Sequence, residues 1–227
     1  DLEQPPAMSF IDLSHDFADG MPGFSLRREG EVRQFTASIR PFVTHRDSAP
    51  FYDGQASFEI TEISFQTSIG TYLDSPRHRW PDRRDIAGLT LDEVILPGLC
   101  VTVADARPDE RIGLSRLDLP EDLAGKAVLI RFGWDIHWAT PAYDHYPFID
   151  ADVIAALRDR GAKLLGVDTP NADSRSELSR PAHTVLLGQD ILIVENLCDL
   201  GRLPATGFRF FCVPIKAVGA AAMTIRA

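Results

Sequence analysis

Short apolar stretches bounded by glycine, proline or charged residues recur along the whole chain. Such stretches, rich in Val, Ile and Phe, are typical of β-strands. They predict strands at 9–14 (SFIDLS), 58–65 (FEITEISF), 100–104 (CVTVA), 127–132 (AVLIRF), 163–168 (KLLGVD), 191–196 (ILIVEN) and 208–215 (FRFFCVPI). In residues 58–65 the apolar positions change face midway, which predicts either a bulge or burial on both faces.

One segment, residues 151–160, has the pattern of an amphipathic helix. Asp150 stands at the N-cap position, an apolar stripe follows, and Gly161 occupies the position where a left-handed residue commonly ends a helix. Shorter helical turns are predicted at 89–94 and 117–123.

Strands outnumber helices in this pattern, and only the pair 151–160 and 163–168 forms a clear helix-to-strand step. The sequence therefore predicts a mixed α/β fold with more than one sheet, in a single domain spanning 1–227, and not a regular doubly wound sheet. Residues 20–57 are rich in Gly, Pro and charge without a clear period. A long excursion of this kind is usually functional or forms an interface.

Composition narrows the class of protein. The 227 residues are 44% hydrophobic, which is enough for a sizeable core, and the net charge of −10 argues against a surface that binds a phosphate backbone. The sequence has no apolar run long enough to span a bilayer and no N-terminal signal pattern. The three cysteines are widely spaced in apolar surroundings, which predicts reduced thiols in a cytoplasmic protein. These features favour a protein that acts on small molecules, without a nucleic-acid or membrane partner.

The segment 67–80, TSIGTYLDSPRHRW, holds the first candidate chemistry. Pro76 stiffens the connection between Asp74 and His78, and Gly70 permits a tight turn before them. An aspartate and a histidine on a rigid loop suit either metal binding or a base with its orienting carboxylate.

A second candidate pair lies more than a hundred residues later. Glu195 ends an apolar strand, where a carboxylate is costly unless it is paired or bound to a cation, and His183 precedes that strand. Asp168 closes another strand in the same manner. Strand ends from distant parts of a chain often meet at one rim, so we expect these groups to face one cavity.

Taken together, these segments resemble the cyclase family that includes bacterial kynurenine formamidase (arylformamidase) and isatin hydrolase. The similarity runs nearly end to end, through residues 10–24, 58–78, 128–138, 161–173, 180–204 and 207–219. Residues 68–78 correspond to the family signature H-x-G-T-H-x-D-x-P-x-H. The resemblance implies a swivelling β/β/α fold, found as a homodimer or homotetramer.

The resemblance also implies roles for individual residues. Asp74 matches the family's metal-bridging carboxylate, His78 its catalytic base, and His183 and Glu195 its remaining ligands for zinc or manganese. The chain departs from the signature at Ser68 and Tyr72, where the family has metal-binding histidines.

Three hypotheses follow. In the first, one divalent ion on Asp74, His183 and Glu195 activates water, and His78 moves protons during cleavage of an amide, formamide or lactam of an aromatic molecule. In the second, a metal-free cyclase, dehydratase or lactone hydrolase uses His78 with Glu195 or Asp74, and Tyr72 donates a hydrogen bond. In the third, the chain binds a small molecule without catalysis. We favour the first because four of the six signature positions are kept.

Aromatic residues flank the matched segments, and the family places such residues against a flat substrate. The candidates for the substrate pocket are Ser68, Phe24, Trp80 and Trp138. The ordinary interpretation of each aromatic residue is core or interface packing.

Overall fold

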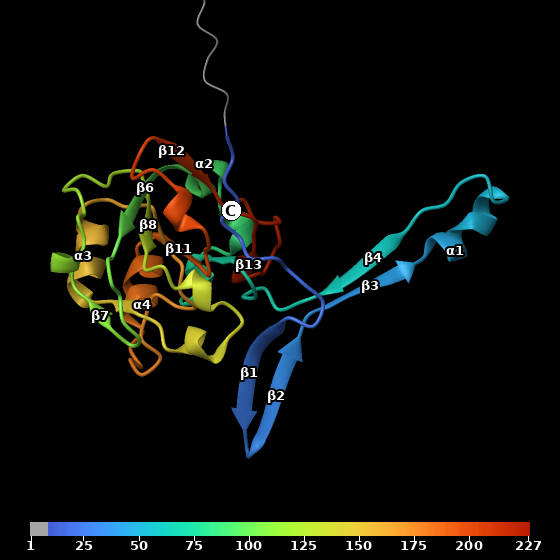
Figure 1. The fold of residues 1–227 in the computed structure, drawn as a ribbon, viewed down its shortest axis with the longest axis horizontal. Helices are drawn as coiled ribbons and strands as arrows, with labels where there is room; N and C mark the ends of the chain where they lie inside the picture. The colour runs from blue at the N-terminus through green and yellow to red at the C-terminus, as the bar shows by residue number, and fades with distance from the viewer. Residues whose placement is uncertain (1–8) are drawn as a thin grey trace, which may run out of the picture.

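A seven-stranded sheet forms the centre of the protein, and the computed structural model describes residues 9–227 (Figure 1). The strand order is β12-β6-β8-β10-β11-β5-β13. The bounds are β12 Phe208–Phe211, β6 Ile95–Thr102, β8 Ala127–Arg131, β10 Leu164–Val167, β11 Leu192–Glu195, β5 Tyr72–Asp74 and β13 Ala222–Thr224. β6, β8, β10 and β11 are parallel, whereas β12, β5 and β13 run antiparallel to their neighbours.

The inner strands are apolar along their whole length because both faces of the sheet are covered. In β8, Val128 and Ile130 belong to one buried cluster, and Leu129 between them belongs to the other. Alternate side chains of one strand thus enter two separate cores, as the two-residue repeat of a strand requires.

Two helices cover one of these faces, α3 (Ala151–Asp159) and α4 (Pro181–Gly188). The Asp150 carboxylate accepts the Ala151 amide hydrogen at the start of α3, and Gly161 has a φ of 82° just beyond its end. Both sequence-based predictions at this helix are confirmed. Among residues 9–227, no helix has the length and apolar character needed to cross a bilayer.

The remaining helical segments are short. They are α1 His45–Ser48, α2 Leu91–Val94, and the 3₁₀ turns η1 Ala49–Tyr52, η2 Pro76–His78, η3 Ile86–Gly88, η4 Leu114–Arg116, η5 Asp135–His137, η6 Pro141–Asp144 and η7 Leu200–Arg202. β7 (Arg111–Ile112) and β9 (Phe148–Ile149) form a small parallel pair. The turn η2 matters most for the site because it carries His78.

Two hairpins extend away from the central sheet (Figure 1). One joins β1 (Pro22–Arg28) to β2 (Glu31–Thr36), and the other joins β3 (Ser38–Val43) to β4 (Ile60–Ser64) through α1 and η1. We call residues 22–64 the arm. It occupies most of the segment for which the sequence predicted a long excursion, and the strands β1 to β3 were not predicted.

The mixed α/β fold with several sheets is confirmed, but some predicted elements are wrong. Residues 9–14 form no strand, and only Ser14 makes an isolated bridge, to Leu197. Residues 117–123 form no helix. α4 was missed because its residues are apolar around most of the helix, so no amphipathic stripe marks it.

The change of apolar face in residues 58–65 has a specific cause. The pairing of β3 with β4 shifts register between Pro41 and Val43, as at a β-bulge, and four of the five β4 residues are exposed. The extra residue of this bulge is Phe42, in β3, whereas β4 itself contains none. Burial on both faces is wrong, and the apolar positions change face because both faces of β4 are exposed.

Candidate active site

Two antiparallel strands bring the early and late segments of the chain together. In the pairing of β5 with β11, Tyr72 lies opposite Glu195 and Asp74 lies opposite Ile193. The side chains of Tyr72, Asp74 and Glu195 are all buried. Because Tyr72 and Asp74 are two residues apart on one strand, they share one face of the sheet.

The helix α4 supplies His183 from its first turn, and Asp173 fixes this imidazole. One Asp173 oxygen accepts the Ala182 amide hydrogen at 2.6 Å; the other accepts the His183 amide hydrogen at 3.1 Å and lies 2.7 Å from His183 Nδ1. Asp173 therefore caps the helix and holds the ring at the same time. With Nδ1–H donated to a carboxylate, Nε2 is directed at the site, as is common for metal-binding histidines.

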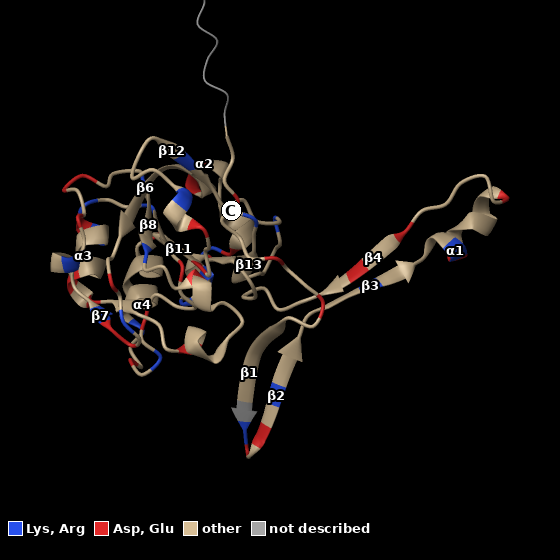
Figure 2. Cartoon of the chain, in the orientation of Figure 1, with Lys and Arg blue, Asp and Glu red and all other residues tan. Residues whose placement is uncertain are grey.

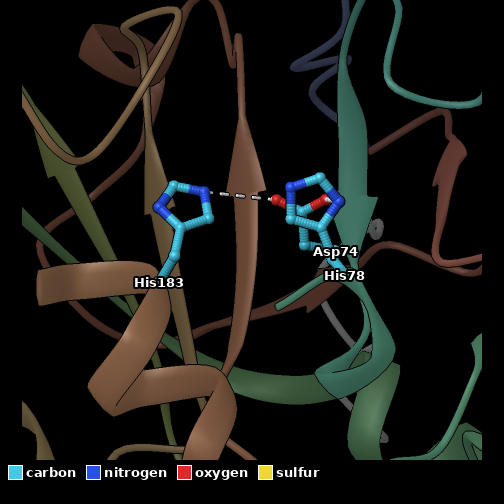
Figure 3. Close-up of side chains that lie close together, drawn as sticks. All are labelled: Asp74, His78 and His183. Atoms are coloured by element: carbon cyan, nitrogen blue, oxygen red, sulfur yellow. Dashed lines mark ion pairs between the residues drawn. The ribbon is translucent and has the colours of Figure 1, made fainter. Parts of the chain in front are cut away.

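Four functional groups meet at this point, and Figure 3 shows three of them, Asp74, His78 and His183. His183 Nε2 lies 3.5 Å from Asp74 Oδ2 and 3.4 Å from Glu195 Oε1. His78 Nδ1 lies 3.3 Å from Asp74 Oδ1, and the two imidazole rings are 5.8 Å apart. The side chain of His78 is 35% exposed, so the group opens to solvent on the His78 side.

The buried charges shift one another's pKa values. Burial opposes protonation of His183, but Glu195, Asp173 and Asp74 outweigh it and raise the pKa of His183 to about 10. Burial raises the pKa of Glu195 to about 7, although the positive charge of His183 acts in the other direction. The acidic groups around His183 thus favour a positive charge at this point, and a proton on the imidazole or a bound cation would supply it.

Tyr72 is a neutral phenol in this setting. Burial, followed by the negative charges of Glu195 and Asp74, raises the pKa of Tyr72 well above its usual value. Its hydroxyl donates to Glu195 Oε2, while Glu195 Oε1 accepts the Ala172 amide hydrogen at 2.8 Å. Both Glu195 oxygens are thus occupied by hydrogen bonds from the chain.

Asn196, the residue after Glu195, holds the loop that leads into β5. Its side-chain amide donates to the Gly70 carbonyl at 2.6 Å, and its side-chain oxygen accepts the Tyr143 hydroxyl at 2.9 Å. Gly70 has a φ of 65°, which a residue with a side chain rarely adopts. Thr71 completes the connection because its hydroxyl donates to the Asn196 carbonyl at 2.6 Å.

The predicted pocket residues are less closely grouped. Ser68 is half-buried in the loop before Tyr72. Trp138 stacks on His15 at 3.9 Å and packs edge-on against Tyr143, so it joins the network behind Glu195.

Two of the candidates lie outside the central group. Trp80 donates its indole hydrogen to the Thr184 carbonyl, and it lines a surface cavity of about 490 Å³ whose lining does not include Asp74, His78 or His183. Phe24 lies on the arm and is 69% exposed. Within a single chain, the structure therefore does not bring Phe24 to the site, because the hairpin that carries it points away from the sheet.

Sequence reasoning missed Asp173 and Asn196. Asp173 follows a strand at a short distance and precedes His183 by ten residues, but no spacing rule connects a loop carboxylate to a histidine on a later helix. Asn196 has a φ of 58°, a left-handed conformation that Asn tolerates better than most residues. An Asn directly after a strand-ending acid was the available signal.

Comparisons with known proteins show the family and the fold. The model of the Cyclase family matches residues 11–174. A kynurenine formamidase of Erythrobacter litoralis (strain HTCC2594) is 30% identical over 179 residues, covering 77% of this chain and 78% of that protein.

Two solved structures share the fold. The isatin hydrolase A of Ralstonia solanacearum is 20% identical, with a TM-score of 0.79, and the match covers 95% of this chain and 89% of that one. A Bacillus stearothermophilus protein described as a predicted metal-dependent hydrolase is 21% identical, with a TM-score of 0.68, and the match covers 95% of both chains.

Proposed function

This chain belongs to the Cyclase family, and from that premise we propose that it hydrolyses the C–N bond of an amide, formamide or lactam attached to an aromatic ring, using a divalent cation. The relatives are named for reactions of this class, a formamidase and a hydrolase of the lactam isatin. The substrate class comes from those names, and the support for a cation comes from the arrangement of the chain's own side chains.

The observation that carries the proposal is the state of Asp74. Both of its oxygens are buried, and neither accepts a hydrogen bond from the described residues. A buried carboxylate without hydrogen-bond donors is costly unless a positive charge lies beside it, and protonated His183 or a metal ion in place of that proton would supply the charge. His183 Nε2 stands 3.5 Å away, and its other nitrogen is held by Asp173. The residues therefore fit a divalent metal.

When bound, such a cation lowers the pKa of water and polarises a carbonyl oxygen. Asp74 and His183 would hold it, and either His78 or Glu195 would complete a set of three protein ligands. Whichever of His78 and Glu195 does not bind the cation would carry a proton between water and the leaving nitrogen. The sequence-based assignment gives the ligand role to Glu195 and the proton-transfer role to His78. Imidazole with carboxylate ligands suits zinc and also accepts manganese.

The test combines metal content with turnover. We expect roughly one zinc or manganese per chain after purification without chelator, and hydrolysis of N-formylkynurenine or isatin that is lost on chelation and restored by the metal. His183→Ala should lose both properties. His145→Ala is the matched control, because His145 lies at the surface and pairs with Asp109 at 3.0 Å, away from the site. A metal-free chain without hydrolytic activity would refute the proposal.

The second hypothesis, a metal-free acid–base enzyme, has one observation in its favour. Tyr72 occupies a position where the family signature has a histidine, and its hydroxyl is bonded to Glu195. If this reading holds, activity survives exhaustive chelation and is lost on His78→Ala. The same chelation experiment therefore separates the two functions.

We also propose that the chain forms a homodimer or homotetramer through the arm. Of the 17 large apolar side chains that are exposed in the described residues, eight lie in this segment of 43 residues. Figure 2 shows that long parts of both hairpins carry no charged residue. A two-stranded hairpin is marginal in water by itself, and a symmetric second copy is the commonest partner that covers such a surface.

A cytoplasmic location is part of the same proposal. Cys100, Cys198 and Cys212 are all free thiols. Free, buried thiols are typical of proteins kept in a reducing compartment. Non-reducing mass determination after expression with and without an N-terminal export signal would test it, because the exported form is expected to oxidise.

A further inference from the structure

Two buried carboxylates, Asp74 and Glu195, face His183 Nε2, and they differ in how their oxygens are used. Glu195 accepts hydrogen bonds at both oxygens, from the Tyr72 hydroxyl and from the Ala172 amide. Asp74 accepts none at either oxygen from the described residues. An oxygen that already accepts a strong hydrogen bond is a poorer metal ligand than one that does not.

Tyr72 is the reason for this difference. A phenol at this position offers a hydrogen-bond donor, whereas an imidazole offers a lone pair to a cation. Its hydroxyl reaches across the strand pair to Glu195 because the two residues lie directly opposite each other. With a phenol in place of the imidazole, position 72 no longer offers a metal ligand. The phenol also occupies one oxygen of Glu195, the second ligand affected, with a hydrogen bond.

His78 lies where it can act as a metal ligand in place of Glu195 and of the histidine that Tyr72 replaces. One ligand atom from each of Asp74, His78 and His183 lies within 4.8 Å of the other two. His78 Nδ1 is 3.3 Å from Asp74 Oδ1, and His183 Nε2 is 3.5 Å from Asp74 Oδ2. Ligand atoms that share one zinc ion are about 3 to 4 Å apart, since each zinc bond is about 2 Å long.

We infer that this chain holds its cation with Asp74, His78 and His183, and that Tyr72 keeps Glu195 out of the ligand set. This inference rests on the proposed function and changes its assignment of roles. His78 becomes a ligand at the solvent-exposed side of the site, from which water or substrate would reach the cation. Glu195 and Tyr72 form a hydrogen-bonded pair next to the cation.

Isothermal titration calorimetry of the chelator-treated protein with Zn²⁺ tests the ligand set without reference to activity. We expect His78→Ala to weaken Zn²⁺ binding by at least about 100-fold, since a ligand should cost more than the 10- to 100-fold of a supporting residue. Glu195→Gln should change affinity by less than about fivefold. Tyr72→Phe frees one Glu195 oxygen and should strengthen binding severalfold. His145→Ala again serves as the control.

A spectroscopic count of nitrogen ligands guards against a misfolded variant. With Cu²⁺ as the probe, electron paramagnetic resonance should show two imidazole nitrogens in the wild type and one in His78→Ala. Loss of Zn²⁺ binding in Glu195→Gln with normal binding in His78→Ala would overturn the inference and leave the proposed function standing. A wild-type chain that binds no Zn²⁺ or Mn²⁺ would overturn both.

Discussion

The central sheet and the arm both contain many large apolar residues, but the sheet buries them and the arm exposes them. In the sheet, apolar side chains such as Leu129 and Leu165 are fully buried between helices, turns and neighbouring strands. In the arm, Phe42 and Phe51 are 68% and 71% exposed. Both regions satisfy their backbone hydrogen bonds by strand pairing, so the difference lies in what covers the side chains.

That contrast is the basis of the proposal that the arm is covered by a second copy of the chain. Burial of apolar area stabilises a fold by about 25 cal/mol per Å². The sheet gains this stabilisation from the chain itself, whereas the arm has little to gain until another surface covers it. We therefore expect substitutions in the sheet to change the free energy of unfolding, and substitutions in the arm to change association.

The largest effect is expected from a matched pair of leucine truncations. Leu129→Ala, at a fully buried position of β8, should lower the free energy of unfolding by about 3 to 5 kcal/mol. Leu26→Ala, on the arm at 48% exposure, should lower it by less than about 0.5 kcal/mol. Urea unfolding followed by circular dichroism measures both. Equal effects would mean that the arm is as well packed as the sheet.

A buried acid in the sheet predicts a dependence of stability on pH. Burial raises the pKa of Asp168 to about 7, although the Phe132 and Gly133 amides donate to its oxygens. The unfolded chain, in which this group has a pKa near 3.9, binds fewer protons between pH 4 and 7 than the folded chain. Stability from this group is therefore present at pH 4 and lost as the pH rises to 7, by at most about 4 kcal/mol.

Asp168→Asn isolates that contribution. Its free energy of unfolding, plotted against pH, should lack the fall between pH 4 and 7 that Asp168 adds to the wild type, whatever its absolute stability. Parallel curves for the two proteins would show that Asp168 titrates alike in the folded and unfolded states.

The next largest change in the free energy of unfolding is expected from metal binding. A cation at 100 times its dissociation constant adds about 2.7 kcal/mol to the free energy of unfolding. We expect Zn²⁺ or Mn²⁺ to raise the melting temperature of the wild type and to leave that of His183→Ala unchanged. Limited proteolysis within the arm should not respond to the metal. Equal stabilisation of the His183→Ala protein would place the ion elsewhere.

We expect the double variant Phe42→Ser, Phe51→Ser to change the free energy of unfolding least. The same variant should weaken association of the chain strongly. Burial of the two phenyl groups together contributes about 3 to 6 kcal/mol to association. The dissociation constant of the dimer should therefore rise by at least about 100-fold. Analytical ultracentrifugation measures it. Ile136→Ser, which changes a 78% exposed residue outside the arm, is the control. A wild type that is monomeric at high concentration would contradict the proposed assembly.

Much of the site follows from the sequence because its groups lie at the ends of recognisable segments. Asp74, His78, His183 and Glu195 were each singled out by their local context, and the structure brings all four together. Glu195 was predictable because a carboxylate at the end of an apolar strand needs a partner, and Asp74 and His78 because Pro76 stiffens the loop that carries them.

Their mutual arrangement was not predictable. The sequence shows a tyrosine where the family signature has a histidine, but only the register of β5 against β11 places its hydroxyl on Glu195. The support of His183 by Asp173 depends on how a loop returns to the first turn of α4. Both contacts join residues that are far apart along the chain or separated by irregular structure, and no local pattern encodes such distances.

By itself, then, the sequence determined the strands at 127–132, 163–168 and 191–196, the helix 151–160 and the identity of the charged groups, because these depend on local periodicity and on the cost of burying charge. The tertiary structure decided which carboxylate is left without hydrogen bonds and which part of the chain projects as an arm. Those outcomes depend on packing and register, in which a shift of one residue turns every side chain to the opposite face of a strand.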